Sequence, residues 1–341
     1  KIDKAFLELP SEVLQVSMRE HQKFFSLREK TSKFISAFII VANITAKDDG
    51  KSVIKGNERV LRARLSDAKF FWKNDLRRIK SYGYQSFVEK LKSVTFHNLL
   101  GTEAERIERI ADISAIIASK IDANPINTRL AASLCKLDLV SEMVYEFPEL
   151  QGVIGQHYAS EEGFDSSVSR ACYEHYLPRG PLDDVPHLPI SIALALADKI
   201  DMICSFWSIN LKPSGSKDPF ALRRAAIGVI RILLENELKL SLTSLLKLSD
   251  RDVDFVDLLT FFHERVKVHF IEKGIRYDVF NSVSSKLDQD LTLREIFQRG
   301  HSIQNFVKTK SGKDLIQGYK RAINILKAEE SRDRVEYSLD P

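Results

Sequence analysis

Apolar residues recur at helical spacing through most of the chain, and this periodicity constrains the fold more than any other feature. In residues 214–238, Leu222, Ala226, Val229 and Leu233 follow one another at intervals of four, three and four, which places them on one face of an α-helix. We therefore expect a mainly α-helical chain. The other segments that we predict to be helical are 65–83, 102–121, 127–147, 150–159, 166–177, 190–207, 254–274 and 312–330.

Helix-start signals precede several of these segments. Thr102 and Glu105 have the spacing of a capping box, in which each side chain bonds the other residue's backbone N–H. The segment that ends at Gly83 is predicted to begin at Ser66 or Asp67, because short polar side chains cap free N–H groups. These signals predict separate helices joined by short loops.

The first fifty residues have a different pattern. Residues 12–18 (EVLQVSM) and 34–44 (FISAFIIVANI) carry β-branched residues and predict strands, and residues 47–50 (KDDG) predict a turn. We expect a small α+β segment at the start of the chain.

The segment 214–238 also carries regularly spaced cations. Asp218 is predicted to cap a helix whose first residue is Pro219, where a missing N–H costs nothing. Lys217, Arg224 and Arg231 are seven residues apart and lie in line if Lys217 has near-helical geometry. Such a row is either a phosphate-binding surface or a solvated face with ion pairs.

Positive charge is concentrated in residues 51–92. The chain carries a net charge of +4, yet this segment holds twelve Lys and Arg and four acids, so it contributes +8 and the rest −4. A basic segment of this kind favours a polyanionic partner such as nucleic acid. Aromatic residues that could stack on unpaired bases are interleaved with it, although for Phe70 and Phe71 we favour a place in the helix core. These aromatic residues are Phe70, Phe71, Trp72, Tyr82 and Tyr84.

Several classes of protein are disfavoured. The most apolar segment, 190–207, contains Asp198, Lys199 and Asp201, so we predict no membrane span. The three cysteines lack paired spacing, which disfavours a zinc site or a disulfide framework and indicates a reducing, cytoplasmic location. The sequence contains no GxGxxG, P-loop or GxSxG motif. Because it begins at Lys1, we expect a piece of a longer protein.

Three residues have the order of metal ligands in HD-type phosphohydrolases, namely Asp138, His157 and Asp198. That family uses a His on an early helix, an adjacent His-Asp pair and a late Asp. Here the pair position is Leu137–Asp138, and no His lies between His97 and His157. We interpret the three residues as remnants of a degenerate HD-like domain and predict no metal site. For Asp198 we favour the alternative of a helix carboxylate bonded to a neighbour, and His157 could equally be a packed histidine.

Six longer segments carry distinctive motifs. They are 56–75 (GNERVLRARLSDAKFFWKND), 100–110 (LGTEAERIERI), 135–159 (CKLDLVSEMVYEFPELQGVIGQHYA), 195–201 (ALADKID), 215–232 (GSKDPFALRRAAIGVIRI) and 319–326 (YKRAINIL). In these segments, and in their order, the sequence is similar to the beta subunit of bacterial heterotetrameric glycyl-tRNA synthetase.

The resemblance implies a three-part organisation. Residues 1–92 would form the α+β segment with a basic helical end, 93–248 the HD-like helical domain, and 249–341 the truncated start of a helical anticodon-binding-like domain. The implied function is that of a tRNA-binding subunit of glycine–tRNA ligase with no catalytic residue on this chain. The candidate tRNA-binding residues are Arg59, Arg62, Arg64, Lys217, Arg223, Arg224, Arg231, Lys320 and Arg321.

The resemblance also implies partners. The alpha subunit would hold the aminoacylation site with ATP, Mg²⁺ and glycine, so we expect no cofactor on this chain. The two subunits would form an alpha2beta2 assembly that binds tRNA-Gly. Two other hypotheses stay open: an active HD-type nucleotide phosphohydrolase, and a helical scaffold without RNA contact.

Overall fold

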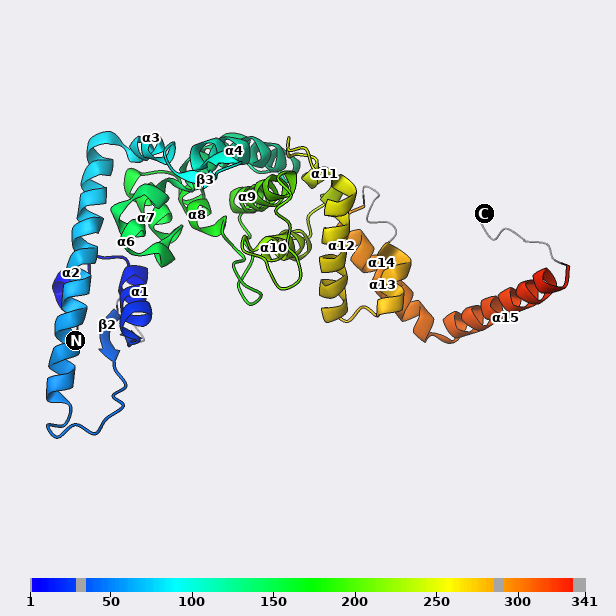
Figure 1. Cartoon of the computed structure of the whole chain (residues 1–341), viewed down its shortest axis with the longest axis horizontal. Coiled ribbons are helices and arrows are strands. Elements are labelled where there is room, and N and C mark those ends of the chain that lie inside the picture. Colours follow the sequence, from blue (N-terminus) through cyan, green and yellow to red (C-terminus); the bar gives the residue numbers. More distant parts are fainter. Residues whose placement is uncertain (1, 29–34, 285–290, 334–341) are drawn as a thin grey trace. The chain divides into compact units, whose positions relative to one another are not determined.

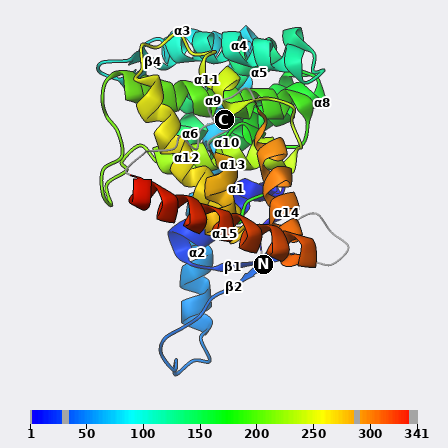
Figure 2. The same ribbon diagram turned by 90° about the vertical axis from the view of Figure 1, so that its right-hand side faces the viewer.

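The computed structural model describes residues 2–28, 35–284 and 291–333. Within these residues the chain is mainly α-helical, with two small antiparallel sheets, which confirms the predicted fold class (Figures 1 and 2). It divides into two compact units. Unit 1 comprises Lys1–Ile232 and Leu248–Asp252, and unit 2 comprises Leu233–Lys247 and Val253–Pro341. The predicted three-part functional division stays a prediction.

Unit 1 begins with a short 3-10 helix, η1 (Lys4–Phe6), followed by α1 (Ser11–Gln22) and a hairpin of β1 (Phe25–Arg28) and β2 (Ile35–Ile39). The predicted strand at 12–18 is wrong, because these residues lie in α1. Val13, Leu14 and Met18 are buried at helical spacing, so the packed face outweighed the β-branched composition. The prediction for 34–44 is confirmed in part by β2.

Helix α2 (Lys51–Tyr82) follows and runs beside α1 (Figure 1). The predicted start at Ser66 or Asp67 is wrong, since one continuous helix of 32 residues begins at Lys51. The helix starts directly after the predicted turn at 47–50. There the Asp48 carboxylate accepts a hydrogen bond from the Ser52 N–H at 2.8 Å. Gly83, at φ 77°, ends the helix as predicted.

The rest of unit 1 is a helical domain. Its central helix α9 (Pro189–Ser208) is buried along most of its length and packs against α4 (Glu103–Lys120), α5 (Pro125–Leu134) and α8 (Ser166–Glu174) (Figure 2). The other elements are η2 (Tyr84–Phe87), α3 (Val88–Leu91), β3 (Thr95–His97), β4 (Gly101–Thr102), η3 (Leu137–Val140), α6 (Glu142–Glu146), η4 (Pro148–Leu150), α7 (Val153–Glu162) and α10 (Leu222–Glu235).

Local signals explain where these helices begin. The capping box of Thr102 and Glu105 is present at the start of α4, as predicted. The single helix predicted for 127–147 is wrong, because α5 ends at Leu134 and the chain then forms η3 and α6. The cause is Ser141, whose hydroxyl caps α6 by accepting from the Val144 N–H at 3.1 Å.

Helix α10 begins at Leu222, three residues later than predicted. The Asp218 carboxylate does accept hydrogen bonds from the N–H groups of Leu222 and Arg223, both at 2.9 Å. Ala221 lies between Asp218 and Leu222 and has φ 54°, which is outside helical geometry. The helix therefore begins after Ala221, and Pro219 precedes it.

Unit 2 contains α11 (Leu242–Leu246), α12 (Phe255–Glu272), α13 (Tyr277–Ser284), α14 (Leu293–Lys308) and α15 (Lys310–Asp333). Its core includes an edge-to-face contact between the rings of Phe270 and Phe280, whose centroids are 5.7 Å apart. Gly274, at φ 91°, follows α12 as predicted. Among the described residues of both units, no helix combines the length and the apolar character that a bilayer crossing requires.

Candidate functional site

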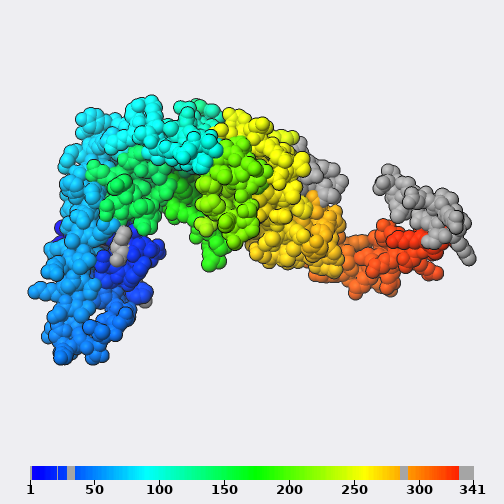
Figure 3. Space-filling view, in the orientation of Figure 1, coloured from blue at the N-terminus to red at the C-terminus, as the bar shows by residue number. Residues whose placement is uncertain are grey.

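The basic face of α2 is exposed at its N-terminal half, which forms one edge of unit 1 (Figure 3). Arg59 is exposed, and Arg62 is 66% exposed with its guanidinium 3.2 Å from an Asp3 carboxylate oxygen. Arg64 points inward instead. It pairs with Glu146 and its guanidinium lies 4.3 Å from the centre of the Phe147 ring. Arg59 and Arg62 are therefore available to a polyanion, whereas Arg64 joins α2 to the helical domain.

The aromatic residues of α2 divide between surface and core. Phe70 is 61% exposed, so our preference for a core position was wrong for this residue, while Phe71 beside it is half-buried. Trp72 is buried and its ring stacks on Tyr158 at 5.2 Å between centroids. Tyr82 is 77% exposed. Phe70 and Tyr82 are the aromatic side chains here that an unpaired base could reach.

The row predicted from Lys217, Arg224 and Arg231 does not form. Lys217 is exposed but lies in a backbone bridge with Ser214, outside α10. The guanidinium of Arg231 donates to three carbonyl groups of the loop between α8 and α9, including that of Asp183 at 2.8 Å. Arg231 thus anchors the loop on α10, and Arg224 remains exposed on the same helix.

The other predicted tRNA contacts lie apart in the chain. Arg223 donates to the Gly215 carbonyl at 2.8 Å and so closes the loop before α10. Lys320 and Arg321 are exposed on α15 in unit 2. None of these placements tests RNA binding, and the residues remain candidates.

Asp138 is a buried anchor for the start of α7. Its Oδ2 accepts hydrogen bonds from the backbone N–H groups of Gly152 at 2.6 Å and Gly155 at 3.1 Å. Burial raises the pKa of Asp138 to about 6, against these two hydrogen bonds. A Cβ on Gly155 would lie 3.2 Å from the carboxylate, so glycine permits this close approach.

His157 belongs to a different contact. Its Nε2 lies 3.5 Å from a Glu12 carboxylate oxygen, and its ring meets Trp72 edge-on at 6.1 Å between centroids. The hydrogen bond with His157 lowers the pKa of Glu12 to about 2. This geometry fits the packed-histidine alternative, in which His157 joins α7 to α1.

Asp198 lies in a buried charge cluster. Its Oδ1 is 2.9 Å from Lys136 Nζ and 2.9 Å from Arg106 Nη2, and the Lys136 ammonium also lies 3.2 Å from His175 Nε2. Burial acts to raise the pKa of Asp198, but Lys136 and Arg106 outweigh it and hold that pKa far below its ordinary value. An ammonium therefore occupies the space between the carboxylate and the imidazole.

The three predicted remnants thus engage different partners. Across residues 2–28, 35–284 and 291–333, no group of three His, Cys, Asp or Glu side chains is arranged to hold a metal ion. The side chains that do come together were missed by sequence reasoning, namely the cations Arg106, Lys136 and Lys199 and the imidazole of His175. Their signal was present, since each lies within an otherwise apolar helix face or turn, where a charge needs a partner.

A cavity of about 360 Å³ opens beside this cluster in unit 1. Helices α4, α9 and α10 contribute to its wall, together with the segment after α5 and the loop after α8. The lining residues are Glu103, Arg106, Lys136, Leu139, Gln151, Tyr176, Pro178, Arg179, Asp198, Lys199, Met202, Ala221, Arg224 and Ala225.

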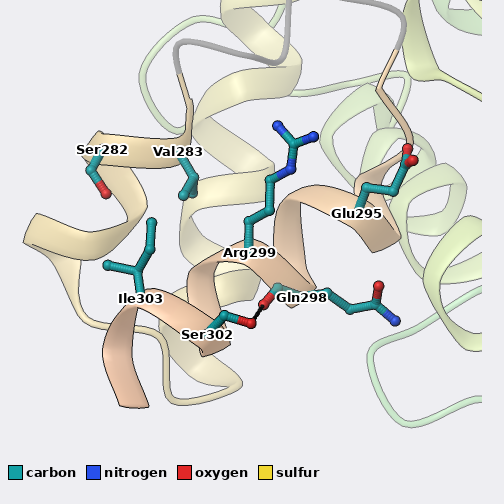
Figure 4. A pocket seen from close by; sticks show the side chains of 7 residues that line it. All are labelled: Ser282, Val283, Glu295, Gln298, Arg299, Ser302 and Ile303. Carbon is teal, nitrogen blue, oxygen red and sulfur yellow. Dashed lines mark hydrogen bonds between the residues drawn. The ribbon is translucent and has the colours of Figure 1, made fainter. Parts of the chain in front are cut away.

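A second hollow lies in unit 2 between α13 and α14 and has a volume of about 430 Å³ (Figure 4). Arg299 and Glu295 rise from α14, and the Ser302 hydroxyl donates to the Gln298 carbonyl at 2.9 Å. Its charged groups come from a single helix, with an apolar wall at Val283 and Ile303, so it offers no converging set of charges.

Comparison with known proteins gives one consistent result. A family model described as glycyl-tRNA synthetase beta subunit matches residues 1–285. Over 99% of its length the chain is 50% identical to the glycine–tRNA ligase beta subunits of Ruegeria sp. (strain TM1040) and Paracoccus denitrificans (strain Pd 1222), and 44% identical to that of Rhodospirillum centenum (strain ATCC 51521 / SW). The chain spans about half the length of these relatives, 49%, 49% and 48% respectively. The chain belongs to the glycyl-tRNA synthetase beta subunit family.

Proposed function

We propose that this chain is the tRNA-binding, non-catalytic part of a glycine–tRNA ligase that supports ATP-dependent attachment of glycine to tRNA-Gly. The observation that carries the proposal is the family match, which covers residues 1–285 and agrees with 50% identity to named beta subunits. On this proposal the bond chemistry takes place on a separate alpha subunit, which binds ATP, Mg²⁺ and glycine. The two subunits assemble as alpha2beta2 in the cytoplasm.

The surface of α2 supports the RNA-binding part of the proposal. A basic helix face gains affinity for RNA by neutralising phosphates, which requires cations that are exposed and not buried in the protein's own ion pairs. The α2 cations that are exposed are Lys51, Lys55, Arg59, Arg62, Lys73, Arg77 and Lys80. Of these, Arg62 and Lys73 make ion pairs at the surface, with Asp3 and Glu8.

The phosphohydrolase alternative gains no support from the residues that were predicted to carry it. Asp198 is already neutralised by Lys136 and Arg106, and these fixed cations repel a metal ion from its carboxylate. Asp138 and His157 are bound to other partners. We therefore retain RNA binding as the function.

The test is equilibrium binding of the full chain to tRNA-Gly and to a non-cognate tRNA across a salt series. We expect the double variant Arg59→Ala/Arg62→Ala to reduce the slope of log K against log salt by about 0.7–0.9 for each phosphate that is no longer neutralised. Both tRNAs should lose affinity by similar factors, because phosphate contacts carry no sequence information directly.

Arg129→Ala is the matched control, because Arg129 is an exposed arginine on α5 that pairs with Asp112. It should leave the salt slope unchanged. Salt-independent binding, or an unchanged slope in the double variant, would favour the helical scaffold without RNA contact at α2.

A further inference from the structure

The cavity of unit 1 has an excess of positive charge on its wall. Five cationic side chains and two carboxylates line it, and the carboxylates already have partners. Asp198 pairs with Lys136 and Arg106, and Glu103 lies 3.6 Å from an Arg106 nitrogen. Asp201, which does not line the cavity, also pairs with Arg106 at 3.3 Å, so five cations face three carboxylates. The five cations are Arg106, Lys136, Arg179, Lys199 and Arg224.

Both buried lysines have hydrogen-bonding capacity to spare. An ammonium group has three N–H donors. Lys199 Nζ donates to the carbonyl groups of His175 at 3.1 Å and Leu177 at 2.7 Å. Lys136 Nζ contacts Asp198 at 2.9 Å and His175 Nε2 at 3.2 Å. Each ammonium thus has one N–H beyond these contacts, and that of Lys136 also lies 4.6 Å from the centre of the Tyr176 ring.

Two arginines on the wall add further donors. Arg179 donates through Nη2 to the Gln151 carbonyl at 2.8 Å and lies 5.0 Å from the centre of the Tyr176 ring, which leaves most of its N–H groups unused. Arg224 is exposed and, in the part of the chain that the structure describes, no side chain or carbonyl is bonded to its guanidinium. The apolar part of the wall is formed by Leu139, Pro178, Met202, Ala221 and Ala225.

Helix α10 has a glycine, Gly228, where the Lys199 side chain packs against it. A Cβ on Gly228 would lie 2.8 Å from Lys199 Cε and 3.1 Å from its Cδ. The lysine side chain therefore crosses α10 at a helical position where no side chain blocks it. Glycine in a helix interior costs about 1 kcal/mol relative to alanine, so this crossing has a stability cost that the packing must offset.

We infer that this cavity binds a phosphate monoester, with the phosphate at the lysine and arginine donors and the esterified group against Tyr176 and the apolar wall. A phosphate monoester is close to dianionic at neutral pH and presents three strong acceptor oxygens, which suits several converging cations. The volume of about 360 Å³ is within the range of small-molecule sites. The monoester is either the terminal phosphate of an RNA or a free mononucleotide. The RNA source rests on the proposed tRNA binding, and the mononucleotide source does not.

Protonation of Lys199 gives the site a pH dependence. Burial lowers the pKa of Lys199 to about 8, with Asp198 opposing and Lys136 and Arg179 adding to the shift. His175 stays neutral, because burial and Lys136 lower its pKa well below the ordinary value. A bound anion favours the charged lysine, so affinity should fall as pH rises through 8 and binding should take up protons.

The test uses the full chain and two pairs of probes. AMP is compared with adenosine by calorimetry, and tRNA-Gly carrying a 5′-phosphate is compared with the same tRNA carrying a 5′-hydroxyl. We expect the phosphorylated member of at least one pair to bind about tenfold more tightly, as for one charge-assisted hydrogen bond or more. Arg224→Ala and Gly228→Ala should each remove this preference, whereas Arg129→Ala should preserve it.

The outcomes separate the two sources and the two proposals. If AMP binds more tightly than adenosine but the 5′-phosphate of tRNA has no effect, the site binds free mononucleotides. If only the 5′-phosphate of tRNA improves binding, the site binds an RNA end. If neither phosphate improves binding while both tRNAs still bind, the inference is wrong and the proposed function stands. A phosphate preference that survives in both Arg224→Ala and Gly228→Ala would also overturn the assignment. If AMP binds but neither tRNA does, the phosphate site is supported and the proposed tRNA-binding function is contradicted.

Discussion

At the residue scale, the most informative group is the charge cluster around Asp198. A carboxylate inside a helix that is otherwise apolar must be neutralised, and here Lys136 and Arg106 come from outside that helix to do so. The cluster ties α4 and the turn after α5 to α9. It therefore fixes the relative positions of the elements that form the cavity wall.

We expect Lys136→Met to destabilise the chain by about 3–5 kcal/mol, because removing one partner of a buried ion pair leaves the other insufficiently compensated. Urea unfolding measures this change. The exposed pair of Arg129 and Asp112 provides the comparison, and Arg129→Ala should cost about 0–1 kcal/mol. Similar costs for the two variants would show that Lys136 is not held in a buried pair.

Asp138 gives a pH-dependent prediction. Its folded-state pKa of about 6 lies above the value of about 3.9 for an unfolded aspartate, so its contribution is greatest below pH 4 and is lost as pH rises to 6. The Asp138→Asn variant has no such titration. Relative to this variant, the wild-type chain should lose about 2 kcal/mol of stability between pH 4 and 6, and about 3 kcal/mol over the full titration of Asp138. Parallel stability curves for the two proteins would contradict the raised pKa.

At the element scale, helix α2 shows what the sequence could and could not predict. Its end at Gly83 was predictable, because glycine at positive φ is a strong local signal. Its start was missed because residues 51–60 are polar and have no apolar stripe of their own. They are helical as a continuation of the buried face that begins at Leu61. Charge contacts such as Lys136 with Asp198 were missed for another reason, since their partners lie far apart in sequence.

Gly56 tests the corrected start of α2. It lies inside the newly identified part of the helix, and a Cβ there would meet no atom within 4 Å. We expect Gly56→Ala to stabilise the chain by about 0.5–1 kcal/mol, since alanine is the better helix former and restricts the unfolded chain. Gly163→Ala is the opposite control, because Gly163 ends α7 at φ 91° and alanine there should destabilise. A neutral Gly56→Ala result would indicate that residues 51–60 are not stably helical in solution.

At the scale of the whole molecule, the proposed function requires a division of labour between this chain and another subunit. The chain gathers cations on α2 and around the cavity of unit 1, and these can hold phosphates. Transferring an activated glycine requires more than phosphate contacts. It needs groups that position ATP and stabilise the charge developing in the transition state, and on the proposed function those groups lie on the alpha subunit.

We therefore expect the chain alone to give no glycine-dependent exchange between ATP and pyrophosphate. Exchange measures formation of glycyl-adenylate directly, so it reports activation of the amino acid without requiring tRNA. The complete ligase is the positive comparison, and this chain alone should give nothing above the background of the assay buffer. Binding of AMP in the unit 1 cavity would not by itself change this expectation, because holding a phosphate monoester requires phosphate contacts alone, whereas adenylate formation also requires ATP and glycine to be positioned for reaction. Exchange by the purified chain that disappears in Arg224→Ala would instead place an activation site in the cavity and refute the non-catalytic assignment.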